Sequence, residues 1–300
     1  LAASSADLQA NPVAGLSDAD AGRMRFLFDD LNGLSTQTLE TNAFPWKIVT
    51  TALLLERELH PLTPADLDEL GAVFREFGFI PPTGIANWPA GQPAPRFSRP
   101  MGFTAGTINS PAMRFRLEVA NLSCAACHAG VSYDAQGAPQ MRVWLGSPNT
   151  SVNYQAFAIA VTRALSAAAR DPQRFLAAVQ ALYPQLDRRE FRTISGRVLP
   201  ALSQRLAEIA ATTPDYPLGF HGGASGLVNG LGASKRMFGV LPAAAVADDR
   251  GFTSVPDLSN LRLRSSAFWD GGYAPAGKPR FQERTAAEAT DAHYQEFAPI

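Results

Sequence analysis

The sequence predicts a mainly α-helical protein with long loops rich in proline and glycine and with several additional helices. Three observations favour this fold class. Apolar residues recur at helical spacing through much of the chain. The helical stretches are separated by segments in which Pro and Gly lie close together, and the 300 residues contain 23 and 24 of them. Only one short segment, Met141 to Leu145, has the pattern of a strand.

Residues 1–95 are expected to form an N-terminal helical region. Two stretches carry a broad apolar face and therefore predict helices that pack on a core: residues 17–34 and 39–59. A third helix is expected to begin at Thr63, because Pro64 occupies the first helical position and Asp66 can complete a capping box. The prolines and glycines of residues 79–106 predict a long ordered loop or a subdomain boundary.

Residues 96–275 are expected to form a second region with further helices. Helical patterns occupy residues 113–129, 151–170, 171–182, 186–212 and 225–231. Asp171 is the expected cap of one of these helices, and Pro200 is expected to kink another. Residues 276–300 form a polar segment without a capping helix, which suggests that it leads into a further domain.

Composition and charge exclude several classes of protein. A hydrophobic content of 46% and a net charge of −1 are not those of a disordered chain. No segment gathers basic side chains, so nucleic acid is not an expected partner. The most apolar stretches, residues 51–55 and 157–169, are too short or too interrupted to span a bilayer. No leader is recognisable at Leu1, so any export signal is expected to have been removed.

Both cysteines lie in the pentapeptide CAACH, at Cys124 and Cys127, and His128 follows directly. On a helix these spacings place two thiols and an imidazole on one face. The pattern is typical of c-type haem attachment, in which two thioether bonds fix the porphyrin and the adjacent imidazole binds the iron. We therefore expect one covalent haem c in this chain and a cytochrome c-like haem domain in residues 96–275.

Three other interpretations of the cysteines are weaker. A redox dithiol of the thioredoxin kind requires a strand before the first cysteine, and the residues before Cys124 are not expected to form a buried strand. A structural zinc site requires more ligands, but His60, His221 and His293 are scattered and there is no third cysteine. A disulfide between residues so close would add little stability. Because haem attachment requires reduced thiols on an exported chain, we expect a periplasmic or secreted protein.

The second axial ligand of the iron decides the function. A thioether or imidazole there makes an electron carrier, whereas an open position admits peroxide or dioxygen. Met101 and His221 are the first candidates, although Met101 could simply pack in the core and the glycines around His221 could serve only a turn. His221 and Glu118 are candidates for proton transfer to a peroxide. Other candidate ligands are Met113, Met141 and Met237.

Arginines and aromatic residues near the motif complete the expected site. Arg114, Arg116 and Arg142 can hold haem propionates, although an exposed face explains them as well. Three aromatic side chains can line the haem pocket or pack in the core: Trp144, Phe268 and Trp269.

Several segments resemble the bacterial dihaem c-type cytochromes, the family that includes the dihaem cytochrome c peroxidases and the rubber oxygenases. These segments are Arg99–Phe103, Asn121–Gly130, Gly146–Thr150, Val255–Leu261 and Ala267–Gly272. The resemblance implies haem-mediated electron transfer within a dihaem, peroxidase-like oxidoreductase. The alternatives are a monohaem electron carrier docked to a partner subunit and a haem oxygenase that acts on an organic substrate with dioxygen.

The chain departs from that family in two ways. Trp269 stands where the peroxidase pattern has histidine, so no ligand or acid–base role is transferred to that position. The chain also has one attachment motif where its relatives have two. Either a second haem domain lies beyond Ile300, or the protein is a monohaem derivative. The expected partner is accordingly a redox partner protein or a second haem domain.

Overall fold

The computed structural model describes residues 2–29, 43–57, 60–136, 139–212, 223–228 and 253–258. Helix accounts for 48% of the described residues and strand for 19%. The strands form sheets of four, three and two strands. The expectation of a mainly α fold is therefore wrong, because the protein combines helices with two substantial sheets.

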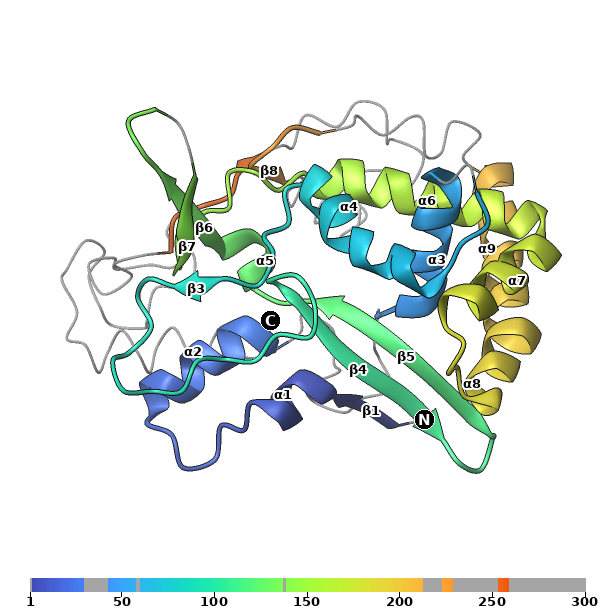
Figure 1. Ribbon diagram of the computed structural model, residues 1–300, viewed down its shortest axis with the longest axis horizontal. Helices are drawn as coiled ribbons and strands as arrows, with labels where there is room; N and C mark the ends of the chain where they lie inside the picture. The colour runs from blue at the N-terminus through green and yellow to red at the C-terminus, as the bar shows by residue number, and fades with distance from the viewer. Residues whose placement is uncertain are drawn as a thin grey trace.

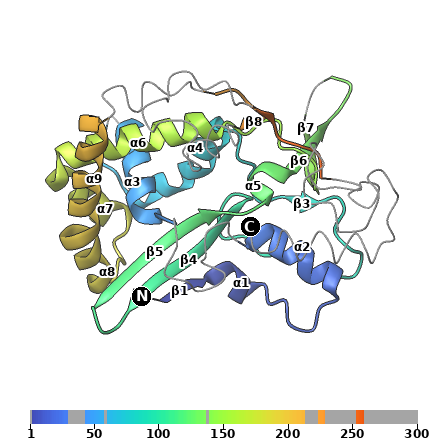
Figure 2. The same cartoon turned by 180° about the vertical axis from the view of Figure 1, so that it is seen from behind.

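A long antiparallel hairpin organises the structure. β4 (Phe103–Ser110) pairs with β5 (Phe115–Leu122) along its whole length. β1 (Ala2–Ser5) pairs with β4, and β2 (Phe44–Pro45) pairs with β5, which gives the order β1-β4-β5-β2. Figures 1 and 2 show the hairpin running between α1 and α2 on one side and a larger group of helices on the other.

The larger group of helices packs on the hairpin through one apolar cluster, and α2 contributes to a second apolar cluster. α1 and α2 span Ala6–Ala10 and Asp18–Phe28. The larger group contains α3 (Trp46–Arg57), α4 (Leu70–Glu76), α6 (Tyr154–Arg170), α7 (Pro172–Leu182), α8 (Arg188–Thr193) and α9 (Leu199–Thr212). Phe103 of β4 lies at the centre of an aromatic cluster that joins these helices to the sheet and includes Phe44, Trp46, Phe74, Phe79 and Phe157.

Helix boundaries with strong local signals are confirmed. Thr63 and Asp66 form the expected capping box, although the helix begins as the 3₁₀ segment η1 (Pro64–Glu69) before α4. Asp171 accepts a hydrogen bond from the amide of Arg174 and so caps α7. A kink is expected at Pro200, and the structure has a π-helical turn, η2 (Ile194–Val198), just before this proline, which cannot donate a backbone hydrogen bond.

Two helices predicted from the sequence are wrong. Residues 113–129 form β5 and the four-residue helix α5 (Ala125–His128), because apolar and polar residues alternate from Phe115 to Val119. Within residues 225–231, β8 (Leu227–Val228) pairs with β9 (Thr253–Ser254). The loop expected over residues 79–106 contains β3 (Gly84–Ile85) and the first residues of β4.

The expected boundary near residue 95 does not separate two cores. β1 and β2 lie before this boundary, yet they pair with β4 and β5 after it. β3 likewise pairs with β7 (Pro139–Leu145), which confirms the strand expected at Met141–Leu145, and β6 (Ala129–Tyr133) completes that sheet. Residues 276–300 lie outside the described residues. Within the described part of the chain, no helix has the length and apolar character needed to cross a membrane.

Candidate functional site

The CAACH motif forms a single helical turn between two strands. β5 ends at Leu122, α5 follows, and β6 begins immediately after His128. The amide of His128 donates to the carbonyl of Cys124 at 2.9 Å and closes the turn. The helix expected around this motif is thus far shorter than the sequence indicated, but it retains the spacing that places the three reactive side chains near one another.

The turn has a buried face and a half-buried face. Ala125 and Ala126 are at most 2% exposed and pack in the core, whereas Cys124, Cys127 and His128 are half-buried. Small alanine side chains allow the turn to lie close against the core. The two thiols and the imidazole are therefore the side chains of this turn that keep some exposure to solvent.

The segment before β4 supports the buried face of this turn. The carbonyl of Gly102 accepts a hydrogen bond of 2.9 Å from the amide of Ser123, and the Ser123 hydroxyl donates to the carbonyl of Leu27 at the end of α2. Met101 is 1% exposed and packs in the apolar cluster that contains Ala125. The structure therefore places Met101 in the core behind α5, on the alanine side of the turn.

The segment after β7 satisfies the carbonyl groups at the end of the turn. The amide of Asn149 donates to the carbonyl of Cys127 at 2.7 Å, and its side-chain amide donates to the carbonyl of Ala126 at 3.2 Å. The amide of Gly146 donates to the carbonyl of His128 at 2.8 Å. Because these carbonyls have no partner further along so short a helix, Gly146 and Asn149 hold the turn in place.

The orientation of the His128 ring is set by a residue 128 positions away. Its Nδ1 atom lies 3.0 Å from the carbonyl oxygen of Pro256. A carbonyl oxygen only accepts hydrogen bonds, so Nδ1 carries the proton and Nε2 has the free lone pair. The amide of Leu258 donates to the carbonyl of Gly146 and fixes the Pro256 segment beside the motif.

The protonation states of the motif follow from its burial. Burial lowers the pKa of His128, although the Pro256 carbonyl and Asp257 act in the opposite direction. Burial, together with the charge of Asp29, raises the pKa of Cys124, and burial and the neighbouring Cys124 raise the pKa of Cys127 to about 11. The site thus combines two protonated thiols with a neutral imidazole at neutral pH.

One sequence argument against a redox dithiol is wrong, because β5 is a buried strand that leads directly to Cys124. Other features still differ from those of an activated dithiol. Reactive cysteines have lowered pKa values, commonly at the N-terminus of a helix, whereas α5 has four residues and both thiol pKa values are raised. Among the described residues, no three His, Cys, Asp or Glu side chains are grouped to hold a bare metal ion.

Of the other predicted site residues, some lie close to the motif and others lie far from it. Trp144 of β7 is directly opposite Gly130 of β6, two residues after His128, and is 45% exposed. Arg142 lies two residues before Trp144 and donates to the carbonyl of Ile85. Both are therefore on the small sheet that begins at the motif.

Arg114 lies far from the motif. It occupies the turn between β4 and β5, so the full length of β5, about 26 Å for eight residues, separates it from the motif. Arg116 is near the same end of β5. Met113 and Met141 are exposed at 45% and 84%. Four further candidates lie outside the described residues: His221, Met237, Phe268 and Trp269.

Glu118, a candidate for proton transfer, is 36% exposed and pairs with two charged side chains that are largely buried, Arg99 and Lys47. Its carboxylate accepts hydrogen bonds from Arg99, at 2.6 Å, and from Lys47. Burial alone would raise the pKa of Glu118, but Lys47 and Arg99 outweigh it and hold the pKa below its usual range. Since a proton-transfer group works best with a pKa near the working pH, this network favours a structural role for Glu118.

We expect Glu118→Gln to weaken the acid dependence of stability. The folded pKa of Glu118 is below the unfolded value of about 4.3, so its stabilising contribution is present above that pH and is lost as the pH falls through the folded pKa. The free energy of unfolding, measured with urea at neutral and at acidic pH, should therefore differ less between the two pH values in the variant than in the unchanged protein. By contrast, burial raises the pKa of Asp7, so Asp7→Asn should enlarge the difference. The same pH dependence in both variants would contradict this assignment.

Segments from distant parts of the sequence meet at the motif: Met101 and Gly102, the pentapeptide itself, Gly146 to Asn149, and Pro256 to Leu258. All of them lie within four of the five stretches in which a family resemblance is expected from the sequence. The fifth, Ala267–Gly272, lies outside the described residues. A comparison of the chain with protein-family models, with curated proteins and with solved structures found no match.

Proposed function

We propose that this chain is a c-type haem protein in which Cys124 and Cys127 anchor the porphyrin and Nε2 of His128 binds the iron. The observation that carries the proposal is the contact between Nδ1 of His128 and the Pro256 carbonyl, beside two thiols on the same half-buried face. A hydrogen bond on one ring nitrogen fixes the tautomer in which the other nitrogen can bind a metal. When bound, haem supplies one-electron transfer through its iron.

The state of the thiols suits thioether formation. Thioether formation would add the sulfur of each thiol to one carbon of a porphyrin vinyl group and its hydrogen to the other, so it would consume no oxidant and release no leaving group. The reaction requires the two cysteines to be reduced, and the structure contains both as free thiols. We accordingly propose that the protein is exported in the reduced form and acquires haem in the periplasm or outside the cell.

Electron transfer is the function class that this site supports best. Trp144 and Arg142 lie on the sheet that begins directly after His128, and they are the residues that would pack on the porphyrin and hold a propionate. Their positions favour the surface around the small sheet as the route for electrons to a redox partner or a second haem domain. Peroxidase-like and oxygenase-like chemistry would additionally require an open axial position.

The intact mass of protein produced with a c-type haem maturation system tests the proposal. We expect the polypeptide mass plus one haem, and the haem should remain attached after denaturation. Cys124→Ala together with Cys127→Ala should abolish covalent attachment, and His128→Met should retain the mass but change the absorption spectrum. His60→Met is the matched control for His128→Met, because His60 is an exposed histidine whose Nδ1 also lies near a proline carbonyl.

The outcomes separate the alternatives. Colourless protein with the mass of the bare polypeptide would refute haem attachment. If the haem-free protein then formed a disulfide between Cys124 and Cys127 reversibly on mild oxidation, its mass would fall by two hydrogens. That result would support the redox-dithiol interpretation, which the position of β5 favours, in place of haem attachment. For the haem-loaded protein, a six-coordinate reduced spectrum that is insensitive to carbon monoxide would identify an electron carrier. Rapid carbon monoxide binding would identify a site open to peroxide or dioxygen.

A further inference from the structure

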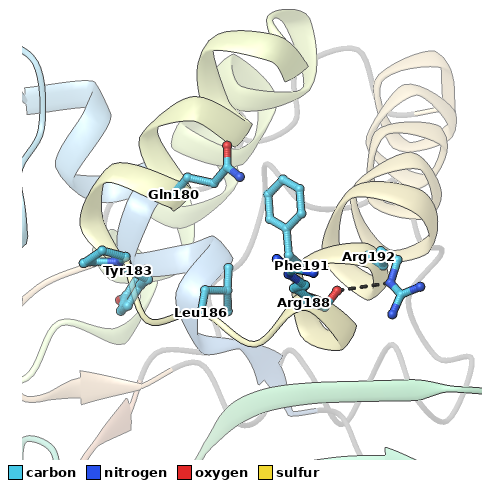
Figure 3. A pocket seen from close by; sticks show the side chains of 7 residues that line it. Gln180, Tyr183, Leu186, Arg188, Phe191 and Arg192 are labelled. Atoms are coloured by element: carbon cyan, nitrogen blue, oxygen red, sulfur yellow. Dashed lines mark hydrogen bonds between the residues drawn. The ribbon is translucent and has the colours of Figure 1, made fainter.

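A cavity of about 450 Å³ that is open to solvent lies between α7 and α8, two helices of the larger group. Figure 3 shows the side chains that surround it. The lining residues are Gln180, Tyr183, Pro184, Leu186, Arg188, Phe191 and Arg192. Its volume falls in the range of small-molecule binding sites, which is about 300–1,000 Å³.

The lining combines apolar surfaces with positive charge. Tyr183, Leu186 and Phe191 are half-buried and provide two aromatic rings and an aliphatic side chain. Arg188 and Arg192 are exposed at its rim, and there is no acidic side chain in the lining. These surfaces are complementary to a ligand with a flat apolar body and a negative charge.

The acidic residues beside the two arginines in the sequence, Asp187 and Glu190, have other hydrogen-bond partners. The carboxylate of Glu190 binds Lys47 at 2.9 Å and accepts from the amide of Glu118. Asp187 caps α8 by accepting from the amide of Arg189. In the described part of the chain, neither cavity arginine forms an ion pair, and Arg192 donates only its Nε to the carbonyl of Arg188. The remaining guanidinium N–H groups are available to an anion.

Tyr183 gives the cavity a fixed wall. Its hydroxyl lies 2.7 Å from the Thr50 hydroxyl of α3, and Lys47 lies 5.7 Å from the centre of its ring. Burial, only partly offset by the Thr50 hydrogen bond, raises the pKa of Tyr183 to about 12, so the hydroxyl stays neutral. Lys47 lies over one face of the ring, and a ring held in this way loses little freedom when a ligand binds beside it.

We propose that this cavity binds an aromatic carboxylate, with its ring against Tyr183, Leu186 and Phe191 and its carboxylate on Arg188 and Arg192. The site is separate from the cysteine motif. It does not depend on haem attachment, and its test uses the whole chain whether or not haem is bound.

Calorimetric titration with 2-naphthoate and its uncharged analogue 2-naphthamide tests the proposal. We expect saturable binding of 2-naphthoate and much weaker binding of the amide. In the double variant Arg188→Gln with Arg192→Gln, affinity for 2-naphthoate should fall about tenfold, because two charge-assisted contacts are lost at a partly exposed rim, while binding of the amide should not change. Arg189→Gln is the matched control, since Arg189 is exposed on the same helix but does not line the cavity.

Three results would overturn the proposal. The first is the absence of saturable binding of 2-naphthoate. The second is equal affinity for 2-naphthoate and 2-naphthamide, which would show that charge is not recognised. The third is an equal loss of affinity in the Arg189→Gln control and in the double variant, which would show a general effect of surface charge instead of a site.

Discussion

Replacement of Lys47 by Met should lower the free energy of unfolding by about 3–5 kcal/mol, the usual cost of leaving a buried charge without its partner. The ammonium group of Lys47 lies 2.9 Å from the carboxylate of Glu190, whose side chain is 5% exposed. Glu190 also accepts a hydrogen bond from the amide of Glu118 at 2.7 Å, so it cannot easily turn towards water. Met retains the apolar stem of Lys and removes only the charge and its donors. Urea unfolding at neutral pH measures the change.

An exposed ion pair provides the control for this substitution. Arg57 and Glu76 form a pair with side chains that are 35% and 57% exposed. Arg57→Met should therefore cost at most about 1 kcal/mol, because water solvates a surface carboxylate that has lost its partner. Adding Glu190→Gln to Lys47→Met should recover part of the loss, since no unpaired charge then remains at that position. A Lys47 variant no less stable than the Arg57 variant would contradict the burial argument.

This network also shows what the sequence could not predict. Lys47, Arg99, Glu118 and Glu190 lie on different elements and are separated by many residues, so no local pattern relates them. Arg99 contacts the ring of Trp46, with its guanidinium carbon 4.0 Å from the ring centre. Such an arrangement exists only once the hairpin and the helices have packed. The cavity between α7 and α8 depends on the same packing.

Elements with short-range signals were predictable, whereas those defined by distant pairing were not. A cap and a proline lie within a few residues of the helix that they begin, so α7 could be located from the sequence. β2 and β3 have two residues each, and each pairs with a strand far along the chain. The alternation from Phe115 to Val119 was a detectable signal for β5, but the surrounding apolar residues favoured a helix.

The candidate site also has a part that the sequence predicts and a part that depends on long-range contacts. The spacing of Cys124, Cys127 and His128 is local, so the sequence alone identified the motif. The partner of the His128 ring is a backbone carbonyl, and any residue type can provide one, so sequence reasoning could not assign it. The role of Asn149 was missed for a related reason, because its side chain binds carbonyl groups of two different segments.

Gly102→Ala should lower the free energy of unfolding by about 4 kcal/mol, combining a strained backbone with an overpacked core. Gly102 has φ +83°, a conformation that residues with a Cβ atom rarely adopt. An added Cβ would lie 2.1 Å from the Cα of Ala126 and 2.2 Å from its amide nitrogen. These are backbone atoms, so no rotamer change relieves the overlap, and α5 must move. Urea unfolding of the chain without haem measures the effect.

Gly91→Ala separates the two contributions, because Gly91 has a similar φ of +81° but open space around the added methyl. The control should therefore cost only the backbone strain, about 1–2 kcal/mol. A shift of α5 would also displace the carbonyl groups that bind Asn149 and the ring that faces Pro256. We thus expect Gly102→Ala, but not Gly91→Ala, to reduce haem attachment during maturation. Equal stability of the two variants would show that Gly102 does not hold the cysteine turn against the core.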